Sequence, residues 1–161
     1  MAGTWVELAA AVHQEALTVR TGARVEVVDL TDEVDAAVRR SGIRDGLAFL
    51  QTLHTTTALV VNENEPLLRE DLRALLERLA PAAGGYLHNE LHRRPDVGVD
   101  ESPNGDSHCR AVLLGHSATL ALGDQRLCLG RWQRLLFIEL DGPRERSLTL
   151  VVMGSREERR G

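Results

Sequence analysis

The stretch from residue 52 to 66 holds side chains that could do chemistry next to a segment that could position them. His54 is followed by three threonines and the apolar segment 58–61, and the stretch ends in the sequence Asn-Glu-Asn-Glu-Pro. Threonine, valine and leucine favour a half-buried strand, whereas the ending is typical of a turn. We therefore expect His54 at one end of a buried strand and residues 62–65 at the other. Polar groups at the ends of a rigid strand can form a site, but a core histidine bonded to a neighbour is the simpler interpretation of this stretch alone.

A second histidine-rich segment runs from His88 to His92 with the sequence His-Asn-Glu-Leu-His. On a helix the two histidines would share one face and could bind a single metal ion. The zincin pattern requires glutamate directly after the first histidine, whereas Glu90 comes two residues later. Zinc deaminases also need a Pro-Cys-x-x-Cys segment, which this sequence lacks. Neither metalloenzyme pattern is matched.

The segment near the C-terminus combines an aromatic residue with arginines around a turn. Trp132 follows Gly130-Arg131, and the commoner position of a lone tryptophan is the core. Arg144 and Arg146 flank a turn that contains Gly142-Pro143. Arginines at such a turn could bind an anion, although an ion pair at the surface is the simpler explanation.

Composition restricts the classes of function. The 161 residues fit one domain, with 43% hydrophobic and 27% charged residues. The net charge of −5 argues against broad nucleic-acid binding. All 19 basic residues are arginine, which excludes Schiff-base lysine chemistry and a Gly-Lys-Ser/Thr phosphate loop. Cys109 and Cys128 have neither zinc-knuckle nor redox spacing. No apolar run is long enough to span a bilayer and no secretory signal is visible, so we expect a cytoplasmic protein.

The periodicity of apolar residues predicts an α+β fold with seven or eight strands and two main helices. We expect Thr31 to be the N-cap of the first main helix and Gly42 to end it. The second should begin at Pro66 and end at Pro81, with a buried leucine stripe. Residues 80–107 show no long periodic segment, which indicates a functional or disordered loop. The remaining elements expected are a short helix over 4–13, a hairpin of 14–20 and 24–29, a strand over 47–53, helical turns over 108–114, a hairpin of 117–122 and 126–129, and strands over 132–140 and 147–152.

Taken together, the motifs resemble one known family. They are His54-Thr-Thr-Thr-Ala58, Asn62-Glu-Asn64, Asp71, Tyr86-x-His-Asn89, Ser102-Pro-Asn-Gly105, Ser107-His108, Leu114-Gly-His-Ser117, Leu127-x-Leu-Gly-x-Trp-Gln133 and Glu139-Leu-Asp-Gly-Pro-Arg144. Their order and spacing over about residues 14–154 resemble the YjbQ family, also called the secondary thiamine-phosphate synthase family. No single motif is diagnostic, but the joint order is.

The resemblance implies a single compact domain with mixed or antiparallel sheets that assembles as a homotrimer. It divides the chain into an N-terminal extension (1–13), the YjbQ-like domain (14–154) and a solvated C-terminal tail (155–161). It also implies a weak thiamine-phosphate synthase activity. That reaction joins a pyrimidine methyl diphosphate to a thiazole phosphate and releases pyrophosphate.

The same resemblance implies a pocket in which His54, His88 and His108 come together. We expect Glu63 to act with these histidines. Six further side chains are expected to bind the substrate: Thr55, Asn62, Asn89, Asp106, Gln133 and Arg144. Many relatives have histidine where this chain has Asp106, and aspartate brings a negative charge and a much lower reference pKa to that position.

Two uses of the three histidines remain open. As neutral imidazoles with an open fourth position they suit zinc. If protonated, they could bind a diphosphate and protonate the leaving group, with magnesium accompanying the diphosphate substrate. Two other functions are a homotrimeric protein that holds a metal or phosphorylated metabolite without converting it, and a metal-dependent hydrolase. The expected partner is a small phosphorylated metabolite, with neither nucleic acid nor membrane involved.

Overall fold

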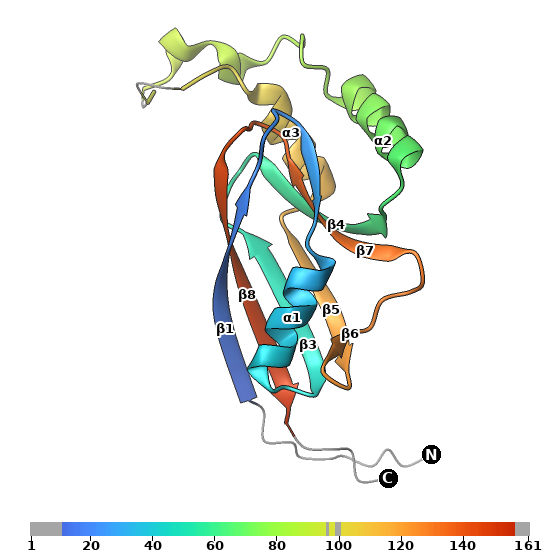
Figure 1. Cartoon of the computed structure of the whole chain (residues 1–161). Helices are drawn as coiled ribbons and strands as arrows, with labels where there is room; N and C mark the ends of the chain where they lie inside the picture. Colours follow the sequence, from blue (N-terminus) through green and yellow to red (C-terminus); the bar gives the residue numbers. More distant parts are fainter. Residues whose placement is uncertain (1–10, 96, 99–100, 157–161) are drawn as a thin grey trace, which may run out of the picture.

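The computed structural model describes residues 11–95, 97–98 and 101–156, which form two β-sheets and three α-helices (Figure 1). The helices are α1 (Thr31–Ser41), α2 (Pro66–Leu79) and α3 (Gly105–Leu114), with 3-10 helices at Leu87–Asn89 and Leu91–Arg93. The strands are β1 (Ala11–Arg20), β2 (Glu26–Asp29), β3 (Asp45–Thr52), β4 (Thr57–Glu63), β5 (Ser117–Gly123), β6 (Arg126–Leu127), β7 (Gln133–Glu139) and β8 (Glu145–Ser155). The predicted α+β class is confirmed, and α3 includes the helical turns expected over residues 108–114.

The chain passes repeatedly between the two sheets. The larger sheet has the order β1-β8-β3-β5-β6 and the smaller has the order β2-β7-β4, and all strand pairs among the described residues are antiparallel. The chain therefore crosses between the sheets after β1, β2, β3, β4, β6 and β7, and the crossings after β1, β3 and β7 lie together. Backbone hydrogen bonds join these three crossings: Thr21 N–H donates to Arg144 O (3.0 Å), Gly142 N–H to Arg24 O (3.0 Å) and Leu140 N–H to Thr56 O (3.2 Å). The three crossings thus form one end of the molecule.

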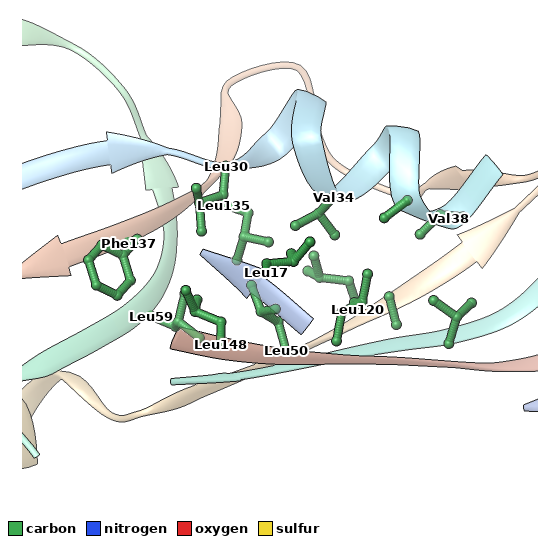
Figure 2. Close-up of a cluster of buried hydrophobic side chains, with 14 of the residues drawn as sticks. Leu17, Leu30, Val34, Val38, Leu50, Leu59, Leu120, Leu135, Phe137 and Leu148 are labelled. Carbon is green, nitrogen blue, oxygen red and sulfur yellow. The ribbon is translucent and has the colours of Figure 1, made fainter. Parts of the chain in front are cut away.

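The main core lies between the two sheets and α1, as Figure 2 shows. In α1, Val34, Ala37 and Val38 are fully buried at the i, i+3, i+4 spacing of a single helix face. They pack with Leu50 of β3 and leucines of β8 and β7. Gly42 ends the helix at φ 67°, in the left-handed region that glycine adopts without steric cost.

The smaller sheet is buried on both faces. Leu59 of β4 and Phe137 of β7 pack into the main core, whereas their neighbours Ala58 and Ile138 form a second cluster with Ala111 of α3. Successive side chains of a strand point to opposite faces, so this alternation places α3 on the side away from the main core. The smaller sheet therefore positions α3 and any functional side chain that the helix carries.

A buried ion pair joins the sheets at the crossings. Glu139, the last residue of β7, is 0% exposed, and it accepts hydrogen bonds from Arg146 Nε (2.7 Å) and Nη2 (2.6 Å). The carboxylate also accepts from Thr21 Oγ1 (3.1 Å) and from the N–H groups of Leu140 (3.0 Å) and Asp141 (2.9 Å). These bonds satisfy a charge that would otherwise be costly to bury.

Several element boundaries differ from the prediction. Residues 14–20 and 24–29 do not form a hairpin, because β1 pairs with β8 and β2 pairs with β7. Alternation alone cannot distinguish paired neighbours from strands in different sheets. Residues 11–13 are strand rather than helix and extend β1, so the expected extension is too long by these three residues; residues 4–10 lie outside the described residues. Ser155 is the buried last residue of β8 rather than part of a tail, and 157–161 lie outside the described residues.

The helix caps were predicted in part. Pro66 begins α2 as expected, and the Glu65 side chain caps the helix by accepting from Leu67 N–H and Leu68 N–H. The N-cap of α1 is Leu30, whereas Thr31 lies inside the helix and its hydroxyl accepts from Leu135 N–H (2.9 Å). The residue expected to cap the helix instead joins it to β7.

The predicted leucine stripe of α2 is only partly buried. Among the described residues of this helix only Leu76 is buried, and Leu75 and Leu79 are exposed. The helix lies beside the sheets rather than over one (Figure 1). A stripe in a sequence identifies an apolar face but not the surface that covers it.

Removing one partner of the buried ion pair should be strongly destabilising. We expect Arg146→Met to cost about 3–5 kcal/mol of unfolding free energy, because it leaves the Glu139 carboxylate buried without its counter-charge. The matched control is Arg20→Met, which removes the exposed partner of Glu145 and should cost at most about 1 kcal/mol. Urea unfolding measures both, and equal losses would contradict the assigned role of the buried pair.

Candidate active site

His54 lies in the crossing between β3 and β4 and is held there by β8. Its Nε2 accepts a hydrogen bond from Ser147 N–H (2.8 Å), and Leu53 N–H donates to Ser147 O (3.1 Å). A backbone N–H can only donate, so Nε2 must carry the lone pair. The neutral ring therefore has its proton on Nδ1, which is the one N–H group that His54 can offer to a ligand.

His88 and His108 come from different segments and contact each other. His88 lies on the 3-10 helix that starts at Leu87, and His108 lies on the second turn of α3. Their ring centroids are 4.6 Å apart, and the planes are inclined at 68°, an edge-to-face arrangement. The contact fixes both rings on the same side of α3.

The contact between the two histidine segments depends on Asn89 and Gly105. Asn89 Oδ1 accepts a hydrogen bond from Gly105 N–H (2.9 Å), one of the N-terminal amides of α3 that have no partner within the helix. A Cβ atom at Gly105 would lie 2.5 Å from Cβ of Tyr86, so only glycine allows this close approach. Asn89, which was expected to bind substrate, instead connects the loop to the helix.

The three histidines border one polar hollow of about 670 Å³. Three arginines line it as well, and each has an acidic partner. Arg94 is paired with Glu101, Arg144 with Asp141 (3.1 Å) and Arg146 with Glu139 (2.6 Å). Asn104 also lines the hollow and donates to Asp141 (3.0 Å). The hollow thus concentrates donors and cationic groups around the histidines while its formal charges are balanced.

The surroundings of His54 and His108 favour their neutral forms. Burial lowers the pKa of His54, and the positive charge of Arg146 lowers it further, although Glu139 opposes that effect. Burial also lowers the pKa of His108, and the neighbouring His88 adds to the shift. Burial alone would raise the pKa of Glu139, but the hydrogen bonds from Arg146 and Asp141 N–H outweigh burial and lower it. The buried pair is therefore ionised, whereas the two imidazoles are neutral near pH 7.

These histidines do not fit a zinc site with three imidazole ligands. Such a site needs one free lone pair from each neutral ring, and the lone pair of His54 already accepts from Ser147 N–H. Within the described ranges, no group of three or more histidine, cysteine, aspartate or glutamate side chains is arranged to hold a metal ion. The donors of the hollow are suited instead to an anion.

Three of the predicted site residues lie away from the histidines. Asn62 and Glu63 are at the far end of β4, about 20 Å along the strand from the crossing that holds His54. Gln133 pairs with Glu63 across the sheet, and its Oε1 accepts from Gly130 N–H (2.8 Å) within its own turn. The sequence predicted correctly that polar groups lie at both ends of the strand. The length of β4 separates the group at one end, which includes Asn62 and Glu63, from His54 at the other.

Asp106 lies in a buried ionic network rather than in the hollow. It is 2% exposed and accepts two hydrogen bonds from Arg24 Nη2 (2.9 and 3.1 Å). Arg110 Nη2 lies 3.7 Å from Asp106 and donates to Glu77 of α2 (2.5 Å). Asp106 therefore holds α3 to the crossing after β1 and is not among the residues that line the hollow.

Of the predicted substrate-binding residues, Thr55 and Arg144 line the hollow with the three histidines. Arg146, considered with Arg144 as an anion ligand, also lines the hollow, as do Glu101 and Asn104, whereas sequence reasoning missed Arg94, Ser102 and Asp141 as site residues. Ser102 and Asp141 belong to the Ser-Pro-Asn-Gly and Glu-Leu-Asp-Gly-Pro-Arg motifs, which could have identified them. Trp132 was expected in the core, but it is exposed and Arg131 stacks over its ring at 4.6 Å.

The fold and the site define an α+β domain with a histidine- and arginine-lined hollow at its sheet crossings. The sequence profile described as UPF0047 protein YjbQ-like matches residues 15–155, and the chain belongs to this family. The UPF0047 protein of Archaeoglobus fulgidus is 45% identical over 85% of this chain and 98% of its own length. UPF0047 protein YugU of Bacillus subtilis is 32% identical over 86% and 97%.

Solved structures agree with the family assignment. A YbjQ-like protein from Sulfolobus solfataricus superposes with a TM-score of 0.80 at 31% identity, covering 91% of this chain and 99% of that one. A YjbQ/UPF0047 protein from Clostridium acetobutylicum has a TM-score of 0.72 at 30% identity, covering 87% and 98%. The fold described for this chain is therefore the fold of the family.

Acidification should destabilise the protein through His54 and His108. Their pKa values are lowered in the folded protein, whereas an unfolded histidine has a pKa of about 6.5. Below about pH 6.5 the unfolded chain binds more protons than the folded protein. The free energy of unfolding therefore keeps its full value above about pH 6.5 and falls as the pH decreases. Urea unfolding from pH 7.5 to 5.5 should show this slope, and His54→Gln should reduce it. His92→Gln, which changes an exposed histidine on the 3-10 helix Leu91–Arg93, should leave the slope unchanged. An identical slope in all three proteins would refute the assignment of the pH dependence to His54 and His108.

Proposed function

We propose that the hollow binds a small phosphorylated substrate and that the protein is a transferase of the thiamine-phosphate synthase type. It would join a pyrimidine methyl diphosphate to a thiazole phosphate and release pyrophosphate. The observation that supports this function most directly is the meeting of His54, His88 and His108, from three separate segments, in a hollow that three arginines also line. Arginine and histidine side chains are common ligands of phosphate groups.

The chemistry asked of the protein is to stabilise a departing anion. In a dissociative substitution the carbon–oxygen bond of the diphosphate ester breaks and its electron pair leaves with pyrophosphate. The lone pair of the thiazole nitrogen then forms the new carbon–nitrogen bond. Preorganised donors aimed at the leaving oxygen are the main means of accelerating such a step. The Nδ1–H of His54, the ring N–H of His108 and the guanidinium of Arg144 supply such donors. A magnesium ion would enter as part of the diphosphate substrate.

We propose further that the protein is a homotrimer that associates through the outer face of its larger sheet. Along β1, β8, β3 and β5, side chains facing away from α1 are uncharged between the strand ends, and Leu47, Val12 and Met153 lie in one exposed row. An uncovered face that is uncharged and carries a row of exposed apolar side chains is typical of a subunit interface. Native mass spectrometry should give three chains, and Phe49→Glu in the middle of the face should give monomers.

The location and partners that we propose follow from the same function. A small phosphorylated metabolite, rather than nucleic acid or membrane, is the partner, and the cytoplasm is where it would be met. Within the described residues no helix has the length and apolarity to cross a bilayer.

The transferase function predicts that His108 is required for turnover. With both authentic substrates, His108→Gln should lower the rate of pyrophosphate release by about 10²–10³-fold, the usual effect of losing one donor to a developing anion. His92→Gln is the matched control because His92 lies outside the hollow, and it should keep the wild-type rate. Substrate binding without any pyrophosphate release from the wild-type protein would refute the transferase function and leave a binding protein.

A further inference from the structure

A second hollow adjoins the polar one and differs from it in chemistry. Its volume is about 560 Å³, and it lies between the crossing after β3 and the outer side of α3. The two hollows share four bordering residues: Leu53, His54, Thr55 and His108. Each volume is within the range of a small-molecule site.

The side chains that line the second hollow include no arginine, aspartate or glutamate, and three of them are histidines: His54, His108 and His116. Ala111 and Val112 of α3 form one wall, and Thr52 and Thr57 lie opposite. The two threonine hydroxyls are hydrogen-bonded to each other at 2.6 Å, so each already has a polar partner. With no arginine among its side chains, this hollow suits an apolar or aromatic group better than a phosphate.

The polar hollow, by contrast, contains two buried atoms that lack a hydrogen-bond partner within the described residues, although Nε2 of His88 lies 3.9 Å from Oε1 of Glu101. Nε2 of His88 and Oδ1 of Asn104 have no hydrogen bond among the described residues, and Asn104 is only 8% exposed. Unpaired buried polar atoms are costly. Both border the hollow that three arginines line. Nε2 of His88 can donate to a phosphate oxygen, whereas Oδ1 of Asn104 can only accept and therefore needs an N–H or O–H donor from a ligand or a water molecule.

We infer that the two hollows form one bipartite site for a phosphate ester of an uncharged ring, with the phosphate beside Arg144 and the ring beside Val112. This inference rests on the proposed function and names the subsite for each half of its substrate. A ligand that spans the two hollows must pass His54 and His108, two of the four residues that border both. The ester bond between ring and phosphate then lies beside the imidazole groups, where the charge of a departing phosphate develops.

Two probes of equal charge test the assignment by isothermal titration calorimetry. Methyl phosphate carries the anionic group alone, and benzyl phosphate adds an uncharged ring. Benzyl phosphate should bind at least about tenfold more tightly, the gain expected when most of a ring leaves water. Equal dissociation constants for the two probes would overturn the inference.

Paired variants on α3 locate the ring. Val112 is 84% exposed and Leu113 is 58% exposed, so both positions tolerate a polar residue, but only Val112 lines the apolar hollow. Val112→Gln should remove most of the benzyl preference and leave the methyl phosphate affinity unchanged, whereas Leu113→Gln should alter neither. Arg144→Gln should weaken both probes by the same factor. A Val112→Gln effect that is equal for both probes would overturn the placement of the ring.

The outcomes separate this inference from the proposed reaction, because neither probe is turned over. Methyl phosphate binding without a benzyl preference overturns the bipartite site and leaves the anion site intact. A benzyl preference with no pyrophosphate release from authentic substrates supports the site and overturns the transferase reaction. Failure of the wild-type protein to bind either probe overturns both.

Discussion

Glu139 and Arg146 meet where the chain leaves β7 and enters β8, and their buried ion pair ties the two sheets together at that point. A buried pair is weak evidence for stability, since burying two charges costs about as much as their attraction returns. Its structural effect here is to fix the crossings. Glu139 also holds Thr21 of the first crossing, and Arg146 Nη2 donates to Thr56 Oγ1 (3.2 Å) in the second. All three turns are thus set by one guanidinium–carboxylate contact.

The same contact determines the chemistry of His54. Arg146 places a positive charge near the imidazole, and Ser147, the next residue, donates its N–H to Nε2. The ring is held neutral, in one tautomer, and with one N–H left. Asn89 and Gly105 then bring His88 next to His108 on α3, and Asp106 fixes that helix through Arg24. The residues that do not face the hollow therefore account for most of its geometry.

The features that depend on local sequence patterns were predicted correctly. The features that depend on contacts between distant segments were not. The strand over 57–63 and the helix that begins at Pro66 follow from composition and capping, and both are present. The hairpin of 14–29 is wrong because pairing partners are distant in the chain. The family motifs led us to expect Glu63 and Gln133 in the site. They lie instead at the end of β4 opposite to His54. Arg94 carried no motif signal, and only the folded loop reveals that it lines the hollow.

The central claim is that His54 is a neutral Nδ1–H donor in an anion-binding hollow shared with His88 and His108. Long-range proton–nitrogen NMR spectra of the imidazole groups at pH 7.5, recorded before and after addition of inorganic pyrophosphate, test it directly. We expect His54 to carry its proton on Nδ1, with Nε2 unprotonated. Pyrophosphate should shift the signals of the three hollow histidines but not those of His92. A proton on Nε2 of His54, or signals of the three histidines that do not respond to pyrophosphate, would contradict it.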